Sequence, residues 1–265
     1  MLAATRQRFV EDYTRIRHAE GRGSREAAYY LALPYRDLSG RLQDQWTIRG
    51  RSYRYLERRV LPPVETRAGR LLRIADLGAG NGWMSYRLAL RGHFVTAVDI
   101  LADELDGLGA ARHYQPHAAF ERVHAEFDSL PFGDASLDLA VFNASIHYSQ
   151  DYRRTLAETR RCLRPGGCLL IVDSPIYRRR EHGERMKEER HRQFEQTYGF
   201  ASDALASIEY FDEETLRDLA RDLGIRWKTY KPWYGLAWAL RPWKARWNRK
   251  RPPSRFWILE GRFAA

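Results

Sequence analysis

The stretch from Ile74 to Gly82 reads I-A-D-L-G-A-G-N-G. A short apolar run ends in an acid, and three glycines follow at every second position before an apolar, helix-like segment begins. Glycine permits positive φ and lets the backbone approach a ligand closely. The N–H groups of such a loop, and of the helix start behind it, are expected to face that ligand. The pattern predicts a strand joined to a helix around a bound cofactor.

The glycine spacing separates the candidate cofactors. A dinucleotide site needs G-x-G-x-x-G after a strand, but here the third glycine is Gly82, followed by Trp83, so the motif reads D-x-G-x-G-x-G. No G-x-x-x-x-G-K-[ST] phosphate loop occurs in the chain. The next predicted strand ends at Asp99, about 20 residues further on, where an acid accepts hydrogen bonds from ribose hydroxyls. A nucleoside-containing cofactor is therefore expected.

Two further motifs follow in register. Glu126 to Phe132 reads E-F-D-S-L-P-F, and Leu163 to Cys168 reads L-R-P-G-G-C. With the glycine loop and Asp99, they resemble the motifs of class I S-adenosylmethionine-dependent methyltransferases, in the branch with DLGxGxG, DxxxLPF and LxPGG. The resemblance covers residues 71–173. It implies S-adenosyl-L-methionine as cofactor and S-adenosyl-L-homocysteine as product.

The resemblance also implies roles for individual residues. Asp76 would anchor the loop and face the amino group of the cofactor, while Asp99 would hold the ribose hydroxyls with Ile100 packing on the adenine. Either Glu126 or Asp128 would accept from the adenine amino group. The implied cofactor-binding set is Asp76, Gly78, Ala79, Gly80, Gly82, Asp99, Ile100, Glu126, Phe127, Asp128 and Asn143.

Apolar strand-like runs alternate with helix-like segments, which favours an α/β fold. We expect a doubly wound, Rossmann-like sheet that is mostly parallel, with helices on both faces and a C-terminal antiparallel hairpin. A helix over 211–223 should be capped by Asp212. The expected strands are 71–77, 94–99, 119–123, 137–143 and 169–173, and the hairpin pairs 225–230 with 255–263.

Three segments fall outside this plan. Residues 1–68 are predicted to form an N-terminal helical cap on a methyltransferase domain over 69–265. Residues 174–211 are expected to be a lid or substrate-binding insertion, although the charged helical part, 176–200, also fits a solvated helix. Residues 236–251 predict a basic, Trp-rich helix, because Leu236, Leu240, Trp243 and Trp247 share one helical face.

This Trp-rich helix has three interpretations. It packs on the sheet edge with its arginines extended to water, it lies on a membrane surface, or it binds nucleic acid. The net charge of +11 gathers at the chain ends: residues 225–265 carry 11 basic side chains against one acidic, and six of the eight tryptophans. The acceptor is therefore expected to be anionic, or carried on an anionic partner or membrane.

The sequence gives fewer indications of the cellular location of the protein and of metal binding. No apolar stretch approaches the roughly 18 residues that a membrane span requires. The N-terminus lacks the apolar core of a signal peptide. A cytoplasmic protein is expected, with peripheral membrane contact as an option. No metal site is indicated, because Pro116 interrupts the helix that would align His113 with His117.

The catalytic residues are sought after the fourth strand, where residues 143–148 read N-A-S-I-H-Y. Methyl transfer requires an aligned nucleophile, and a base if that nucleophile carries a proton. His147 is the candidate general base because its ordinary pKa lies near neutrality; the alternative is a histidine that packs over the cofactor. Tyr148 and Asp173 are weaker candidates.

The same segment bears on the acceptor. Methyltransferases of base amino groups usually carry [D/N]-P-P-[F/Y] where this chain has N-A-S-I, so a nucleic acid is a less favoured acceptor than a small molecule. We expect O- or N-methylation of a small or lipid-like acceptor by in-line displacement. The alternatives are an RNA methyltransferase that uses its basic C-terminal region and a non-catalytic, cofactor-binding scaffold.

Overall fold

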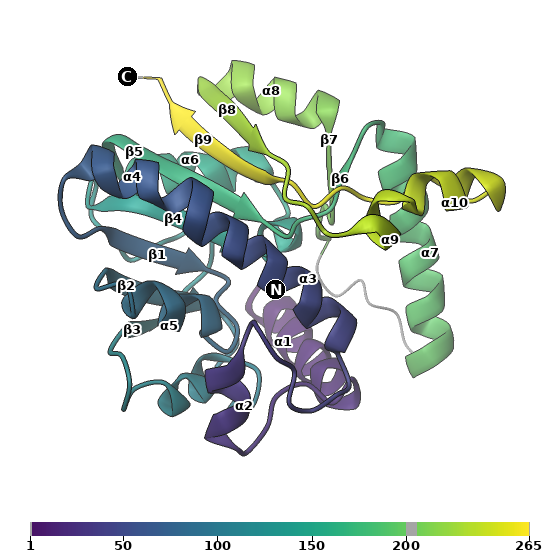
Figure 1. Ribbon diagram of the computed structural model, residues 1–265, viewed down its shortest axis with the longest axis horizontal. Coiled ribbons are helices and arrows are strands. Elements are labelled where there is room, and N and C mark those ends of the chain that lie inside the picture. The colour runs from purple at the N-terminus through teal and green to yellow at the C-terminus, as the bar shows by residue number, and fades with distance from the viewer. Residues whose placement is uncertain (1, 200–205, 265) are drawn as a thin grey trace.

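A seven-stranded sheet organises the protein. The computed structural model describes residues 2–199 and 206–264, and its main sheet has the order β3-β2-β1-β4-β5-β9-β8. Strands β1 to β5 are parallel, whereas β9 is antiparallel to both β5 and β8 (Figure 1). This confirms the predicted mostly parallel, Rossmann-like sheet with its C-terminal hairpin. The strands are β1 Arg73–Leu77, β2 Phe94–Asp99, β3 Glu121–His124, β4 Leu137–Asn143, β5 Leu163–Val172, β8 Ile225–Tyr230 and β9 Ile258–Phe263.

Three strand ranges were predicted correctly, whereas β1 begins two residues later than the expected 71–77 and β3 is shifted from the expected 119–123. The expected ranges 94–99, 137–143 and 225–230 coincide with β2, β4 and β8. Strand β5 begins earlier than predicted, at Leu163, which pairs with Leu137 before a bulge in the register. Strand β9 begins later than predicted, because Arg255 forms a bridge with Ile176 instead.

Helices cover both faces of the sheet, as predicted. On one face lie α3 (Gln43–Tyr55), a π-helical turn (Leu56–Val60), α4 (Leu61–Ala68) and α5 (Trp83–Ala89). On the other face lie α6 (Tyr152–Cys162) and α8 (Glu213–Leu223). Because strands of a parallel sheet are buried on both sides, their residues are apolar without alternation. Six of the seven residues of β4 are buried.

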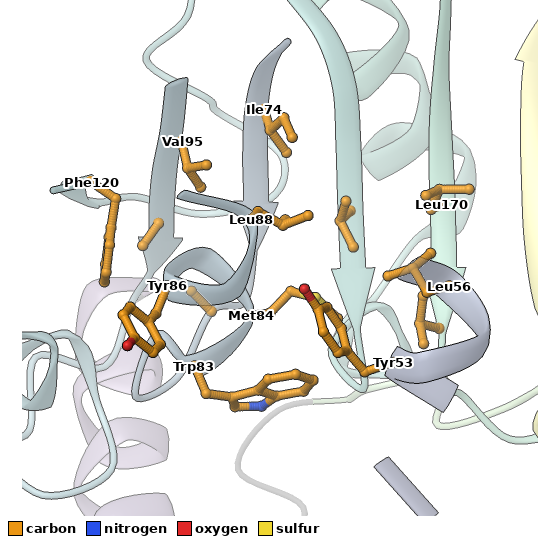
Figure 2. Close-up of a cluster of buried hydrophobic side chains, with 14 of the residues drawn as sticks. Tyr53, Leu56, Ile74, Trp83, Met84, Tyr86, Leu88, Val95, Phe120 and Leu170 are labelled. Atoms are coloured by element: carbon orange, nitrogen blue, oxygen red, sulfur yellow. The ribbon is translucent and has the colours of Figure 1, made fainter. Parts of the chain in front are cut away.

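The core beneath α3 and α5 joins the N-terminal helices to the sheet. Figure 2 shows Leu56 beside the strand residue Leu170, and the ring of Tyr53 near Met84 and Trp83 at the carboxyl end of the sheet. The ring of Tyr53 meets that of Trp83 edge to face, with 5.6 Å between centroids. Residues 43–64 therefore belong to the same hydrophobic core as the strands.

Two more helices precede α3. They are α1 (Leu2–Ala19) and α2 (Ala27–Ala32). Helix α1 lies at the carboxyl end of the sheet, beside α3 (Figure 1). Its Arg17 and His18 contact Asp106 and Asp103 in the segment that follows β2.

The segment between β5 and α8 forms a side structure. Strand β6 (Ile176–Tyr177) pairs in parallel with β7 (Phe211–Asp212), and α7 (Arg180–Tyr198) lies between them in the chain. Residues 200–205 of the predicted 174–211 insertion lie outside the described residues. The predicted helix start at 211 is wrong by two residues, but Asp212 caps α8 as expected, since its carboxylate accepts from the N–H of Thr215 at 2.7 Å.

The basic, Trp-rich helix predicted over 236–251 is divided into two short helices. They are α9 (Leu236–Ala239) and α10 (Arg241–Trp247), with Pro242 in the first turn of α10. Proline lacks an N–H group and cannot continue the hydrogen bonding of the preceding helix. The edge-packing interpretation is wrong as well, because Trp243 and Trp247 are exposed. Among the described residues, no helix combines the length and apolarity that crossing a membrane requires.

Candidate functional site

A cavity of about 390 Å³ opens at the carboxyl ends of β1, β2 and β4. Its walls include Gly78 after β1, Ile100 after β2 and Ala144 after β4. Strand β1 lies between β2 and β4, where the strand order reverses. Ligands of open α/β sheets bind at this switch point. The volume lies within the 300–1,000 Å³ that is usual for small-molecule sites.

The glycine loop turns its N–H groups inward. Those of Gly78 and Ala79 both donate to the carbonyl of Val98, and that of Gly80 donates to the Asp99 carboxylate at 2.7 Å. The N–H of Trp83 is bonded to the side chain of Asn81. The expectation that these loop N–H groups face the ligand is therefore wrong. They tie the loop to β2, which explains why this spacing suits a cofactor without a phosphate at the loop.

Two of the glycines are required for packing. Both adopt positive φ, and a Cβ on Gly78 would lie 2.4 Å from the Cβ of Ser145. A Cβ on Gly82, the residue before α5, would lie 3.1 Å from the ring of Phe120. Gly78, Ala79 and Gly80 line the cavity, whereas Gly82 does not. Gly78 thus lets the loops after β1 and β4 meet beneath the cavity.

Asp76 lies below the loop and does not line the cavity. Its Oδ2 accepts from the hydroxyl of Ser85 in α5 at 2.7 Å, and its Oδ1 has no partner among the described residues. Burial raises the pKa of this carboxyl to about 7. Asp76 therefore contacts α5 and helps to orient it, and Asp76 is not part of the cavity wall.

Asp99 holds the loop and faces the cavity. Its two oxygens accept from the N–H groups of Gly80 and Leu101, at 2.7 and 2.8 Å. Burial raises the pKa of this carboxyl, and the two N–H groups partly offset that effect. Each carboxylate oxygen has a second lone pair, so Asp99 can still accept hydrogen bonds from a ligand in the cavity.

The other predicted cofactor residues line the same cavity: Ile100, Glu126, Phe127, Asp128 and Asn143. Asp128 accepts a hydrogen bond from the hydroxyl of Thr155 at 2.6 Å. Glu126 and Asp128 both line the cavity, so both stay candidates for the contact with the adenine amino group. The Asn143 side-chain oxygen is buried and has no partner within the described part of the chain. Such an oxygen normally has a donor, and a bound ligand with an amino group would supply one. The residues present therefore fit an amino-acid-bearing cofactor.

The three catalytic candidates lie in different environments. Tyr148 lines the cavity, whereas His147 and Asp173 are buried behind its wall. Burial and the positive charges of nearby arginines lower the pKa of His147 to about 3. Its ring packs against Tyr148, with 4.5 Å between centroids. Asp173 accepts from the hydroxyl of Ser52, and burial raises its pKa. His147 thus packs against Tyr148 and does not face the cavity, so this geometry favours neither the base role nor packing over the cofactor.

Sequence reasoning predicted an N-terminal helical cap but did not mark its residues that line the cavity. Phe9, Tyr13 and Arg17, at a spacing of four along α1, all line it. The rings of Phe9 and Tyr13 stack at 5.4 Å, and the hydroxyls of Tyr13 and Tyr148 lie 3.4 Å apart. The spacing indicates a helical face in the sequence, but no sequence signal shows that this face packs over the loop after β1.

Arg49 of α3 is the second feature that the sequence did not mark. Its guanidinium lines the cavity and lies 4.9 Å from the ring of Trp46. No ion pair to Arg49 is formed by any residue that the structure describes, whereas Arg17 across the cavity is paired with Asp106. Burial and the charges of Arg22 and Arg17 lower the pKa of Arg49. Among the described residues Arg49 thus has no direct ion-pair partner, although the charges of Asp173 and Asp106 act on it from nearby and partly offset the fall in its pKa.

Comparison with known proteins agrees with this geometry. Residues 75–171 match the family described as a methyltransferase domain. The chain is 38% identical over 105 residues to a malonyl-[acyl-carrier protein] O-methyltransferase of Erwinia pyrifoliae, a match covering 40% of this chain and 38% of that protein. It is 39% identical over 105 residues to a dimethylglycine N-methyltransferase of Parasynechococcus marenigrum, covering 38% of this chain and 36% of that protein. The chain thus spans under two fifths of the length of either relative.

A solved structure extends the likeness of fold beyond the matched domain. The 1,6-didemethyltoxoflavin-N1-methyltransferase of Burkholderia thailandensis, determined with its substrate and S-adenosylhomocysteine bound, superposes with a TM-score of 0.52. The match covers 86% of this chain and 83% of that one at 20% sequence identity. At this identity the likeness shows a shared fold.

Proposed function

Because residues 75–171 form a class I S-adenosylmethionine-dependent methyltransferase domain, we propose that the protein methylates a small acceptor that carries a carboxylate. The observation that carries this proposal is the cavity between the glycine loop and Arg49. Several lining residues are those to which the resemblance assigns the cofactor. The same cavity is lined by an arginine that has no ion-pair partner among the described residues.

We assign the cofactor to the wall formed by the ends of β1, β2 and β4. Asp99 would accept hydrogen bonds from the ribose hydroxyls, Phe127 and Ile100 would enclose the adenine, and Asn143 would accept from the amino group. S-adenosylmethionine supplies an electrophilic methyl group on its sulfonium. The work of the protein is then to align the acceptor and exclude water.

Arg49 supports the choice of acceptor. A guanidinium binds a carboxylate with two parallel hydrogen bonds, a geometry that lysine cannot provide. The two curated relatives named above act on a malonyl group and on dimethylglycine, and both acceptors contain a carboxylate. An acceptor carboxylate at Arg49 would compensate its charge and fix the orientation of the acceptor beneath α1.

The chemistry at the cavity wall also suits this acceptor. His147 is buried, does not line the cavity and has a pKa of about 3. A carboxylate oxygen has free lone pairs and needs no base at neutral pH, whereas an amine is mostly an ammonium at that pH and has to lose its proton to water before its nitrogen can attack. O-methylation of a carboxylate and N-methylation of an amino acid are both compatible with the site.

The test combines cofactor binding with an acceptor screen. The wild-type protein should bind S-adenosylhomocysteine by calorimetry and should label small carboxylic acids, but not their primary amides, from methyl-labelled cofactor. Label released as methanol by mild base marks an ester, and retained label marks an N-methyl product. Absence of cofactor binding would contradict methyl transfer altogether, whereas labelling of RNA or of the amides would contradict the carboxylate acceptor.

Arg49→Met separates the two possible users of the arginine. Loss of a charge-assisted pair worth about 2 kcal/mol raises the acceptor KM on the order of 30-fold. The affinity for S-adenosylhomocysteine should remain unchanged, and the exposed Arg59→Met should behave as wild type. A weakened affinity for S-adenosylhomocysteine with an unchanged acceptor KM would place the cofactor carboxylate at Arg49 and contradict the acceptor assignment.

A further inference from the structure

The segment with α9 and α10 exposes an unusual set of large apolar side chains. Nine such residues are exposed in the described parts of the chain, and five of them lie within fifteen consecutive positions. Trp243 and Trp247 are 75% and 89% exposed. Water-soluble surfaces rarely concentrate apolar side chains in this way without a partner. We define the docking face as Trp233, Leu236, Leu240, Trp243 and Trp247.

The docking face is held in a fixed position on the protein. Trp238 turns inward and packs on Tyr234 and Phe256, at 5.0 and 5.5 Å between ring centroids. Arg241 donates to the carbonyl of Ser254 at 2.7 Å, and Arg251 pairs with Glu189 of α7 at 2.6 Å. Figure 1 shows α9 and α10 projecting beyond the sheet, beside α7. The exposed tryptophans therefore belong to an ordered, protruding element.

The charges around the docking face have one sign. Residues 231–251 contain seven basic side chains and no acidic one. Lys244, Arg246, Arg249 and Lys250 are exposed, and none of them forms an ion pair with a residue that the structure describes. On α10, Lys244 and Arg246 flank the stripe that carries Trp243 and Trp247. Long basic side chains in such positions can extend to phosphates while their stems stay beside apolar groups.

We propose that the docking face binds the surface of an anionic lipid bilayer. Tryptophan prefers the headgroup level of a membrane, and flanking Lys and Arg attract anionic lipids. A second copy of this chain is disfavoured, because pairing two docking faces would bring fourteen like charges together, twice the seven of each segment. Nucleic acid is disfavoured, because Leu236 and Leu240 would stay in water, whereas a bilayer buries them with the tryptophans.

The docking face is connected to the helix that lines the cavity. The hydroxyl of Tyr234 lies 2.9 Å from that of Ser52 in α3, and it donates to the carbonyl of Phe256 at 2.7 Å. Ser52 is one helical turn from Arg49. Membrane binding would thus fix the orientation of the cavity relative to the lipid. The proposal does not depend on methyl transfer, because no residue of the docking face lines the cavity.

Vesicle flotation of the full chain tests the proposal. The protein should float with vesicles of phosphatidylcholine and phosphatidylglycerol, but not with phosphatidylcholine alone, and added salt should weaken binding. The double variant Trp243→Ser/Trp247→Ser and the charge variant Lys244→Glu/Arg246→Glu should each lower the partition coefficient roughly tenfold or more. The matched control is Leu90→Ser/Phe94→Ser, which removes two exposed apolar side chains elsewhere.

A second measurement excludes misfolding as the cause. All variants should bind S-adenosylhomocysteine, or in its absence unfold at the same urea midpoint, as the wild type does. Failure of the wild type to float with anionic vesicles would overturn the proposal. It would also be overturned if the tryptophan variant floated like the wild type, or if the face bound RNA or an acidic protein while ignoring vesicles.

Discussion

Arg17 of α1 and Asp106, which follows β2, form an ion pair in the lining of the cavity, with 2.6 Å between Nε and Oδ2. Their side chains are 16% and 6% exposed. The charge of Asp106 raises the pKa of Arg17, against the effect of burial. Because both residues line the cavity, this pair fastens the covering helix to the wall on which the cofactor is expected.

Breaking this pair should loosen the covering helix. Arg17→Met leaves Asp106 buried without its partner, a change that costs about 3 kcal/mol. We expect faster proteolysis within α1 and weaker binding of S-adenosylhomocysteine, measured by limited digestion and calorimetry. The exposed Arg8→Met, on the same helix, is the control. Unchanged digestion of the Arg17 variant would show that the pair does not hold α1 in place.

Asp99→Asn should weaken cofactor binding strongly. The substitution replaces charge-assisted hydrogen bonds, each worth about 1.5–3 kcal/mol, with neutral ones and leaves the volume unchanged. The expected loss of affinity for S-adenosylhomocysteine is on the order of tenfold to a hundredfold by calorimetry. Asp134→Asn, at an exposed position paired with Arg161, is the control. Equal affinity of the two variants would remove Asp99 from the site.

Gly78→Ala and Gly166→Ala form a matched pair of variants. Both glycines have similar positive φ, 76° and 81°, but a Cβ on Gly78 would meet Ser145 at 2.4 Å, whereas one on Gly166 would meet nothing within 4 Å. The shared backbone strain costs about 1 kcal/mol. The overlap at Gly78 should add a further 1–3 kcal/mol or so, since the core must shift. Urea unfolding measures both, and equal losses would contradict the steric role of Gly78.

His147 should make stability depend on acid pH. Its folded pKa, about 3, lies below the ordinary histidine value of 6.5, so the unfolded chain binds an extra proton between these pH values. Stability from this residue is therefore present above pH 6.5 and is lost as pH falls, by up to about 1.4 kcal/mol per pH unit.

Comparison with a His147 variant separates the pH dependence caused by His147 from that caused by Asp76. The pKa of Asp76 is raised to about 7, so its contribution to the unfolding free energy changes with pH in the opposite direction. The unfolding free energy of wild type minus that of His147→Gln should fall between pH 7 and pH 5. His117→Gln, at an exposed site, is the control. A difference that stays constant with pH would contradict the buried, neutral state of His147.

The sheet, and the cavity wall formed by the segments after β1, β2 and β4, could be predicted from the sequence because both depend on local patterns. The glycine loop, Asp99 and the apolar run of β4 can each be recognised from a few consecutive residues, and the structure brings all three to one cavity. The direction of the loop N–H groups could not be predicted from the sequence, because these groups donate to the carbonyl of Val98 in a neighbouring strand.

The side of the cavity formed by α1 and α3 depends on contacts between distant segments. Arg17 and Arg49 resemble many other arginines in a basic chain, and only the packing of α1 and α3 over the sheet distinguishes them. His147 shows the reverse case. Its sequence position suggested a base, but burial behind Tyr148 lowers its pKa far below neutrality. Burial of a single side chain is a tertiary property that a local motif does not encode.

The position of β9 has a consequence for the order in which the protein assembles. Strand β9 lies between β5 and β8, and in the described residues it is the last strand to be synthesised. During translation β8 has no strand to pair with until β9, which ends at Phe263, has been synthesised, whereas β1 to β5 can already pair with one another. Nascent chains should therefore contain a formed cofactor wall before the outer edge of the sheet closes, with the apolar side of α8 transiently uncovered.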